Sequence, residues 1–307
     1  MFASIEETED RLAGQGYIIS RETATVVHLA LQLKKPLLVE GPAGVGKTEL
    51  AKVLAAAQAI PLLRMQCYEG LDETKALYEW EYAKQLLYTQ ILKDKISETL
   101  ASCDTLSQAV DGIASEESAF FSDRFLVERP LLKAIRSPDP LVLLIDEVDK
   151  AEPEFEAFLL EVLSDFQVSI PEIGTLRARQ IPQVVLTSNN SRELGDGLKR
   201  RCLYLYLDFP PPEQEARILE AKVPGLDRKL VRQVAEAVRS IRSLDLKKPP
   251  SIGEALDWAR TLLLLNAGRL GPEEIRQGLP VLVKNPADRG QVLKDLGRVL
   301  PAQPKEA

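Results

Sequence analysis

The fold is decided by one stretch, Gly41-Pro42-Ala43-Gly44-Val45-Gly46-Lys47-Thr48. It matches the phosphate-loop pattern G-x-x-x-x-G-K-[ST] in full, with an apolar segment before it and a helical pattern over residues 48–59 after it. Glycines let such a loop turn its backbone N–H groups, and the N-terminus of the next helix, toward phosphate oxygens. We therefore predict that residues 41–48, with the adjoining Glu49, bind ATP, that Lys47 reaches the β- and γ-phosphates and that the Thr48 hydroxyl binds Mg²⁺.

A second motif, Leu141-Val142-Leu143-Leu144-Ile145-Asp146-Glu147, is a continuous apolar run that ends in two carboxylates. Ligands of open α/β sheets bind outside the carboxyl ends of the strands, so the pair is expected at the nucleotide. We predict that Asp146 binds the Mg²⁺ and that Glu147 orients and deprotonates the attacking water. A solvated strand end is the alternative for such a run alone, and the complete phosphate loop upstream argues against it. Asp149 and Lys150 continue the motif and are interpreted as structural.

Two further candidates follow in chain order. The segment 184–189 is apolar and ends in polar residues, so the Asn189 amide could hydrogen-bond the attacking water or the γ-phosphate. The adjacent Arg200 and Arg201 could form a solvated basic corner. An arginine can also be offered to the γ-phosphate of a neighbouring subunit, where its fixed charge stabilises the transition state. That role requires a ring of subunits that meet head to tail.

Apolar runs alternate with helical patterns through the first two-thirds of the chain, which predicts an α/β fold with a parallel sheet flanked by helices. The expected strands are residues 36–40, 62–67, 141–147, 184–189 and 204–209, and the expected helices between them are residues 22–33, 48–59 and 153–164. After the proline cluster 210–212 the period is helical throughout, with expected helices at residues 213–221, 228–241 and 251–267.

This pattern predicts two domains. Residues 1–209 are expected to form the α/β nucleotide-binding core, with a polar helical insertion at 84–117 and a β-hairpin insertion at 166–182. Residues 210–307 are expected to form a small all-helical lid domain and a C-terminal tail, with weak patterning after residue 271.

Composition limits the classes of protein. With 45% apolar and 28% charged residues among 307, the chain is typical of soluble globular proteins, and its longest apolar run is too short to span a bilayer. The three cysteines have no disulfide or zinc spacing, and the first residues do not resemble a signal peptide, so we expect a cytoplasmic protein. The formal charge of −7 makes nucleic acid an unlikely partner. The only histidine, His28, lies in an apolar helical pattern and is expected to pack.

In this order, the motifs resemble those of the AAA+ ATPases, and within them the MoxR group. The resemblance identifies residues 41–48 as Walker A, Leu143–Glu147 as Walker B and Asn189 as sensor 1. By position against the family's Leu-x-x-Arg-Phe ending, it places the arginine finger on Arg201, with Arg200 as the neighbouring candidate. Local MoxR-like sequence occurs at residues 125–134 and 144–150, and phrases similar to the CoxD branch occur at residues 67–72, 78–80, 248–251 and 257–258.

One position departs from this family. Its second sensor, an arginine in the helical lid, would fall near residues 251–254, where this chain has Gly253. Either Lys248 or Arg260 reaches the nucleotide instead, or the lid responds to the γ-phosphate in another way.

The resemblance implies a homo-oligomeric ring, a hexamer by analogy, that acts as a chaperone-like remodeller. It implies a von Willebrand A-domain protein as partner and a target enzyme complex whose metal centre is matured, as for CoxD-like members. The hairpin at 166–182 and the insertion at 84–117 are candidate partner contacts. A nucleic-acid-remodelling AAA+ motor is the main alternative. A P-loop kinase or GTPase is disfavoured because the N-K-x-D guanine motif is absent, and a non-hydrolysing scaffold because Glu147 is present.

Overall fold

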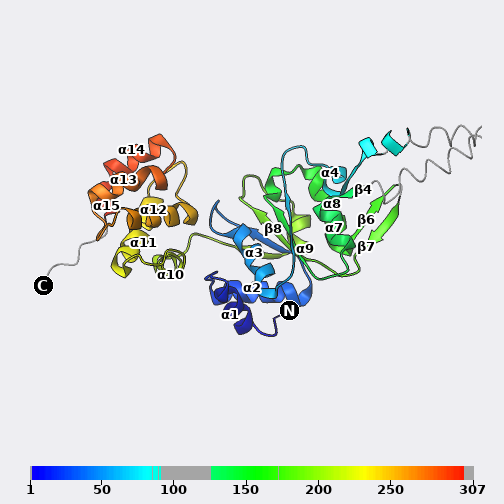
Figure 1. The fold of residues 1–307 in the computed structure, drawn as a ribbon, viewed down its shortest axis with the longest axis horizontal. Helices are drawn as coiled ribbons and strands as arrows, with labels where there is room; N and C mark the ends of the chain where they lie inside the picture. Colours follow the sequence, from blue (N-terminus) through cyan, green and yellow to red (C-terminus); the bar gives the residue numbers. More distant parts are fainter. Residues whose placement is uncertain (1, 85, 89, 91–125, 172, 301–307) are drawn as a thin grey trace, which may run out of the picture. The chain divides into compact units, whose positions relative to one another are not determined.

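The computed structural model describes residues 2–84, 86–88, 90, 126–171 and 173–300 of the chain. Most of the insertion expected at residues 84–117 lies outside these residues. Figure 1 shows the arrangement of the helices and strands.

A five-stranded parallel sheet flanked by helices confirms the predicted α/β fold class. The strand order is β2-β5-β8-β1-β9, with β1 at Leu37–Glu40, β2 at Leu62–Gln66, β5 at Val142–Asp146, β8 at Gln183–Ser188 and β9 at Leu203–Tyr206. Strand β5 runs parallel to both β2 and β8, and its residues are all buried. An unbroken apolar run suits this place because a strand covered on both faces has no polar side.

Two compact units make up the chain. The first comprises Met1–Leu29, Val39–Ala59 and Tyr204–Ala307, and the second comprises Ala30–Leu38 and Ile60–Leu203. The domain boundary that we expect at residue 209 remains a prediction.

In the first unit, the N-terminal helices are α1 (Ile5–Gly14) and α2 (Arg21–Leu33), and α3 (Lys47–Gln58) follows the phosphate loop. The Ser4 side chain caps α1 by accepting a hydrogen bond from Glu7 N. His28 of α2 lies 3.2 Å (Nδ1 to Oγ1) from the buried Thr8 of α1, which agrees with a packing role.

The C-terminal helices of the same unit form one cluster (Figure 1). They are α10 (Pro212–Lys222), α11 (Arg228–Arg242), α12 (Ile252–Leu264), α13 (Pro272–Leu282), α14 (Pro286–Lys294) and α15 (Leu296–Val299). Helix α11 buries Val231, Val234, Val238 and Ile241, at the spacing of one helical face. The first three helices are predicted from the sequence, and the last three occupy the stretch with weak patterning.

The second unit adds short elements around its strands. They are α4 (Glu73–Leu77), β3 (Tyr78–Trp80), β4 (Leu126–Glu128), α7 (Pro130–Arg136), the 3₁₀ turn η2 (Val148–Lys150), α8 (Pro153–Asp165) and α9 (Asp196–Arg201). Strands β6 (Gln167–Ile170) and β7 (Gly174–Arg177) pair antiparallel, so the predicted hairpin is present. The antiparallel pair β3–β4 is not predicted from the sequence.

No helix in the described ranges combines the length and the apolar character that crossing a membrane would require.

Candidate nucleotide site

The phosphate loop leaves the buried strand β1 through backbone that only glycine adopts freely. Gly41 has φ 149°, and a Cβ on it would lie 1.9 Å from the Leu207 carbonyl oxygen. Gly44 has φ 78°, and a Cβ there would lie 2.3 Å from Ser251 Cβ. Helix α3 begins directly after Gly46, and no side chain caps its N-terminus. Its first backbone N–H groups are therefore suited to binding an anion.

Lys47 points its charge into this loop. The residue is 5% exposed, and its Nζ donates to the carbonyl oxygens of Gly41 and Pro42, both at 2.7 Å. A buried ammonium needs such acceptors because burial without them is costly. The Lys47 ammonium thus lies against the start of the phosphate loop, and its role toward the phosphates stays a prediction.

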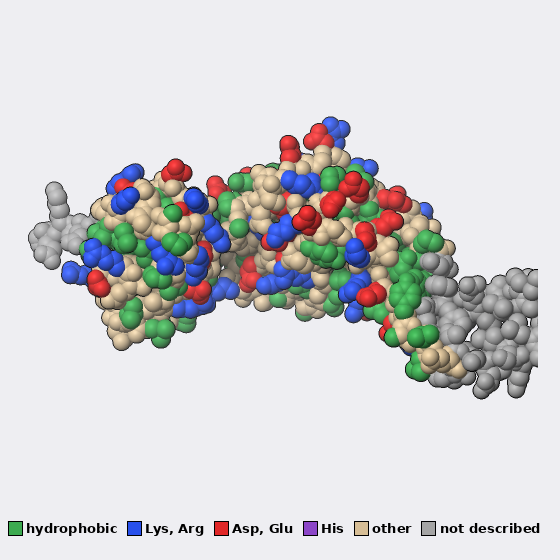
Figure 2. Space-filling view, turned by 90° about the horizontal axis from the view of Figure 1, so that it is seen from above, with side chains coloured by type: hydrophobic (Ala, Val, Ile, Leu, Met, Phe, Trp, Pro, Cys, Tyr) green, Lys and Arg blue, Asp and Glu red, His purple; other side chains and the backbone are tan. Residues whose placement is uncertain are grey.

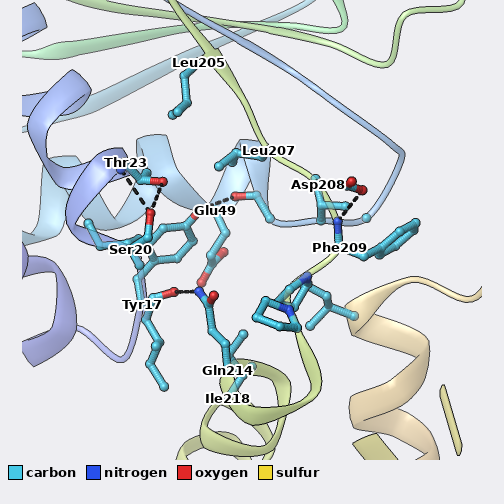
Figure 3. A pocket seen from close by; sticks show the side chains of 18 of the residues that line it. Tyr17, Ser20, Thr23, Glu49, Leu205, Leu207, Asp208, Phe209, Gln214 and Ile218 are labelled. Carbon is cyan, nitrogen blue, oxygen red and sulfur yellow. Dashed lines mark hydrogen bonds between the residues drawn. The ribbon is translucent and has the colours of Figure 1, made fainter. Parts of the chain in front are cut away.

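A pocket of about 770 Å³ adjoins the loop within the first unit (Figure 3). This volume is in the range of small-molecule sites. Its walls come from α2 and the segment before it, from the phosphate loop with Glu49 in the first turn of α3, from β9 and the chain after it, and from α10 and α12. Phe209 contributes an aromatic wall, and Gly253 is among the residues that α12 contributes.

Two hydrogen bonds tie the walls of the pocket together. The Tyr17 hydroxyl donates to the Gly46 carbonyl oxygen at 3.1 Å, and Gln214 Nε2 of α10 donates to the Ile18 carbonyl oxygen at 3.0 Å (Figure 3). Burial, and then the charge of Glu49, raise the pKa of Tyr17 above its ordinary value. The phenol therefore remains a donor to the loop at neutral pH.

Neither basic candidate for the second sensor lines this pocket. Arg260 pairs with Asp257 on its own helix, at 2.9 Å between Nη1 and Oδ1. The backbone N–H of Lys248 donates to Asp288 Oδ2 at 3.0 Å.

The acidic pair lies at the end of β5, in the second unit. Asp146 is 3% exposed; its Oδ1 accepts from Thr187 Oγ1 at 2.5 Å and its Oδ2 from Arg64 Nε at 3.0 Å. Glu147 has φ 57° and ψ 50°, and its N–H donates to Thr187 Oγ1 at 2.9 Å. This left-handed conformation ends the strand and costs energy in a residue other than glycine, as is common at functional sites.

The structure brings Glu147 and Asn189 into contact. Asn189 Nδ2 donates to Glu147 Oε1 at 3.2 Å. The other carboxylate oxygen, Oε2, accepts from Gln66 Nε2 at 2.8 Å and lies 2.6 Å from Lys150 Nζ. The carboxylate is thus held by donors from β2, from the turn after β5 and from the end of β8.

Asp149, interpreted from the sequence as structural, positions the chain around Asn189. Its Oδ2 accepts from the backbone N–H groups of Asn189 (3.2 Å) and Ser191 (2.9 Å) and from the Ser191 hydroxyl (2.6 Å). Burial alone would raise the pKa of Asp149, but the hydrogen bonds from Ser191 and Asn189 lower it below its ordinary value. The ionised carboxylate therefore stabilises the loop that carries Asn189.

The two arginines at the end of α9 differ in their surroundings. Both are exposed. Arg201 Nε donates to Ser164 Oγ at 2.5 Å and its Nη1 to the Gly197 carbonyl oxygen at 3.2 Å. For Arg200, no hydrogen bond or ion pair is formed with any residue that the structure describes.

Four residues of the site are missed by the sequence analysis: Tyr17, Arg64, Gln66 and Thr187. The register of the sheet pairs Gln66 with Asp146, so the polar end of β2 is a signal that could have found it. Thr187 belongs to the polar end of β8 that singles out Asn189. The contact of Tyr17 with the loop has no local signal.

A hydroxyl such as that of Thr48 and a carboxylate such as that of Asp146 are oxygen donors of the kind that Mg²⁺ takes, with water and phosphates completing its shell. Among the described residues, no group of three or more His, Cys, Asp or Glu side chains could hold a metal ion by itself. The assignment of Mg²⁺ to Thr48 and Asp146 therefore stays a prediction from the sequence.

The chain is similar to several known proteins. A gas vesicle ATPase, GvpN of Haloferax mediterranei, is 27% identical over 221 residues, which are 69% of this chain and 58% of that protein. An uncharacterised protein of Staphylococcus epidermidis is 23% identical over 242 residues, 76% of this chain and 78% of that one. A structure of RuvB from Thermotoga maritima is 16% identical, with 97% of this chain and 79% of that chain covered and a TM-score of 0.48.

The family model described as "AAA domain (dynein-related subfamily)" matches residues 36–202. The match includes the phosphate loop and the strand that ends at Asp146, with Glu147 directly after it. The matched residues are more than half of the sequence, and the chain therefore belongs to the AAA domain family, in its dynein-related subfamily.

Proposed function

We propose that the protein is a ring-forming AAA+ ATPase that uses ATP hydrolysis to change the conformation of a partner protein. The contact between Glu147 and Asn189 carries the proposal. A scaffold that only binds ATP has no use for a carboxylate held beside an amide at the end of the sheet. A hydrolase needs both, because the attacking water must be oriented and must lose a proton.

The proposed roles follow the chemistry of each side chain. Backbone N–H groups of the phosphate loop, residues 41–48 apart from Pro42, and the Lys47 ammonium bind the phosphates, with Glu49 at the adjoining pocket. Thr48 and Asp146 would hold Mg²⁺, which would neutralise phosphate charge. Glu147 takes a proton from the attacking water as the water oxygen bonds to the γ-phosphorus. The bond between the γ-phosphorus and the bridging oxygen breaks, which releases ADP and phosphate.

The arginine finger is proposed to be Arg201, with Arg200 as the alternative. Ser164 and the Gly197 carbonyl hold the Arg201 guanidinium in one orientation, and a preorganised donor stabilises transition-state charge better than a mobile one. Arg200 is exposed and makes no such contact with the described residues, so its guanidinium can reach toward a neighbouring subunit without breaking one.

Mixing two inactive variants tests the shared site. Glu147→Gln keeps the arginine and loses the base, whereas Arg201→Ala keeps the base and loses the arginine. In a mixed ring, some interfaces combine an intact base with an intact arginine, so the mixture is expected to hydrolyse ATP faster than either variant alone. Specific activity of the wild type should also rise with protein concentration. A mixture as inactive as its components, or a fully active monomer, contradicts the ring.

The finer assignment is to the MoxR group and its CoxD branch. It is supported by the local sequence at residues 125–134 and 144–150 and by the CoxD-like phrases. On this assignment, the partner is a von Willebrand A-domain protein and the target is a metalloenzyme complex under maturation. The hairpin β6–β7 is the proposed contact. Co-purification of such a partner with Glu147→Gln, and its loss when residues 171–173 are replaced, would test this assignment.

A further inference from the structure

The first turn of α12 lies directly on the phosphate loop. The Ile252 N–H donates to the Gly44 carbonyl oxygen at 3.1 Å. A Cβ on Gly44 would lie 2.3 Å from Ser251 Cβ, so the two backbones approach this closely only because position 44 is glycine. The phosphate loop and a C-terminal helix thus share a main-chain hydrogen bond.

The start of α12 is fixed within the C-terminal helices. Ser251 and Glu254 form a capping box, in which Ser251 Oγ accepts from Glu254 N at 3.1 Å and Glu254 Oε2 accepts from Ser251 N at 2.8 Å. The preceding Pro250 carbonyl accepts from Arg242 Nε at 2.8 Å, and Arg242 forms a buried ion pair with Glu215 of α10. A movement of the backbone at Ile252 is therefore transmitted to α10 and α11 as well as to α12.

Peptide geometry couples this contact to the phosphates. The Gly44 carbonyl and the Val45 N–H belong to one planar trans peptide, so they point in opposite directions. An N–H of Val45 turned into the loop toward a phosphate therefore requires a Gly44 carbonyl turned outward, toward Ile252. Filling the loop and forming the hydrogen bond favour the same peptide orientation.

We propose that α12 responds to bound nucleotide through its main chain, by the Ile252 N–H to Gly44 carbonyl hydrogen bond, in place of a basic side chain. The proposal rests on nucleotide binding at this loop. It accounts for Gly253 in the pocket wall and for the position of Lys248 and Arg260 outside the pocket lining. By reciprocity, the hydrogen bond strengthens nucleotide binding as much as the nucleotide stabilises the docked helix.

Proline at position 252 removes this one donor. Ile252 is the first residue of α12, where helices accept proline, and the preceding Ser251 is extended (φ −74°, ψ 168°), as a residue before proline prefers. Ile252→Ala is the matched control, since both variants lose the side chain and only Ile252→Pro loses the N–H. Thermal unfolding of the two variants checks that each is folded.

Titration with fluorescent ADP, and hydrogen exchange of α12 with and without ADP, give the readout. We expect Ile252→Pro to bind about fivefold more weakly than Ile252→Ala, the net value of one hydrogen bond, and to lose nucleotide-dependent protection of α12. Equal affinities with retained protection overturn the proposal.

Two further variants keep the proposal testable if Ile252→Pro does not fold. Lys248→Ala and Arg260→Ala are expected to bind ADP with an affinity within about twofold of the wild type. On this proposal, neither side chain forms a hydrogen bond with the nucleotide. A tenfold loss in either one overturns the proposal. A wild type that binds no nucleotide contradicts the proposed function itself, and the inference falls with it.

Discussion

Tyr17 acts on the phosphate loop from 29 residues upstream, through its hydroxyl on the Gly46 carbonyl. Tyr17→Phe keeps the ring in the pocket wall and removes only this donor. We expect about fivefold weaker ATP binding, since one hydrogen bond is worth about 1 kcal/mol net. Tyr17→Ala also removes the ring and should weaken binding further. Titration of the three proteins checks this order, and wild-type affinity in Tyr17→Phe would show that the hydroxyl does not contribute.

The lowered pKa of Asp149 predicts that its contribution to the stability of the fold depends on pH. Its pKa is lowered in the folded protein, so the unfolded chain binds this proton more readily. The stability that Asp149 contributes is therefore fully present above its unfolded pKa of about 3.9 and is lost as pH falls through the lower folded value.

Asp149→Asn removes the charge and keeps the shape. We expect it to lower the free energy of unfolding by about 1–2 kcal/mol at pH 7, because hydrogen bonds to a charged acceptor are the stronger ones. The difference from the wild type should shrink below about pH 4. Chemical denaturation between pH 7 and pH 2.5 measures both curves, and a difference that stays constant would exclude the charge as its source.

At the scale of single residues, what the sequence predicts is what lies close together in the chain. The phosphate loop is one contiguous pattern, and Asp146 and Glu147 follow one apolar run. By contrast, Asp149 reaches Ser191 across 42 positions, and no local pattern reveals such a contact.

Helix α13 packs on α12 through Gly278. A Cβ on Gly278 would lie 1.9 Å from Nε1 of the fully buried Trp258, whereas a Cβ on Gly290 in α14 would meet nothing within 4 Å. Gly278→Ala should therefore destabilise the protein by about 1–3 kcal/mol through overpacking. Gly290→Ala is the matched control and should stabilise it by up to about 1 kcal/mol, from helix propensity alone. Thermal unfolding should show opposite shifts in Tm, and equal shifts would contradict this packing.

Helices and strands are predicted correctly where the pattern of their apolar residues extends over enough positions to be recognised. Helix α11 shows one apolar face along its length, and β5 is one unbroken apolar run. Strands β3 and β4 have three residues each, too few to show alternation. In α13 and α14, prolines suggest breaks, yet Pro272 and Pro286 occupy first-turn positions where proline starts a helix.

At the scale of the molecule, the distribution of charge bears on the choice of partner. On the face in Figure 2, Lys and Arg prevail among the charged side chains of the C-terminal helices, whereas Asp and Glu lie among them on the rest of the described surface; the formal charge of the chain is −7. We expect no saturable binding of labelled duplex or single-stranded DNA at low salt, by fluorescence anisotropy. Salt-sensitive binding, or an ATPase rate stimulated by DNA, would favour the nucleic-acid motor instead.

The fold class and the family follow from the sequence because the phosphate loop and the carboxylate-ended strand permit few architectures. The position of the pocket does not follow from the sequence, because its walls come from distant segments, such as those of Ile18 and Gln214, which are 196 positions apart.

ATP turnover and ATP binding, measured together on the wild type and Glu147→Gln, test the central claim most directly. Glutamine has the shape of glutamate but cannot take the proton of water. We predict that the variant binds ATP as the wild type does and hydrolyses it at least about a hundredfold more slowly, the usual value of a general base. Wild-type turnover in Glu147→Gln, or no turnover by the wild type at any protein concentration, would contradict the account.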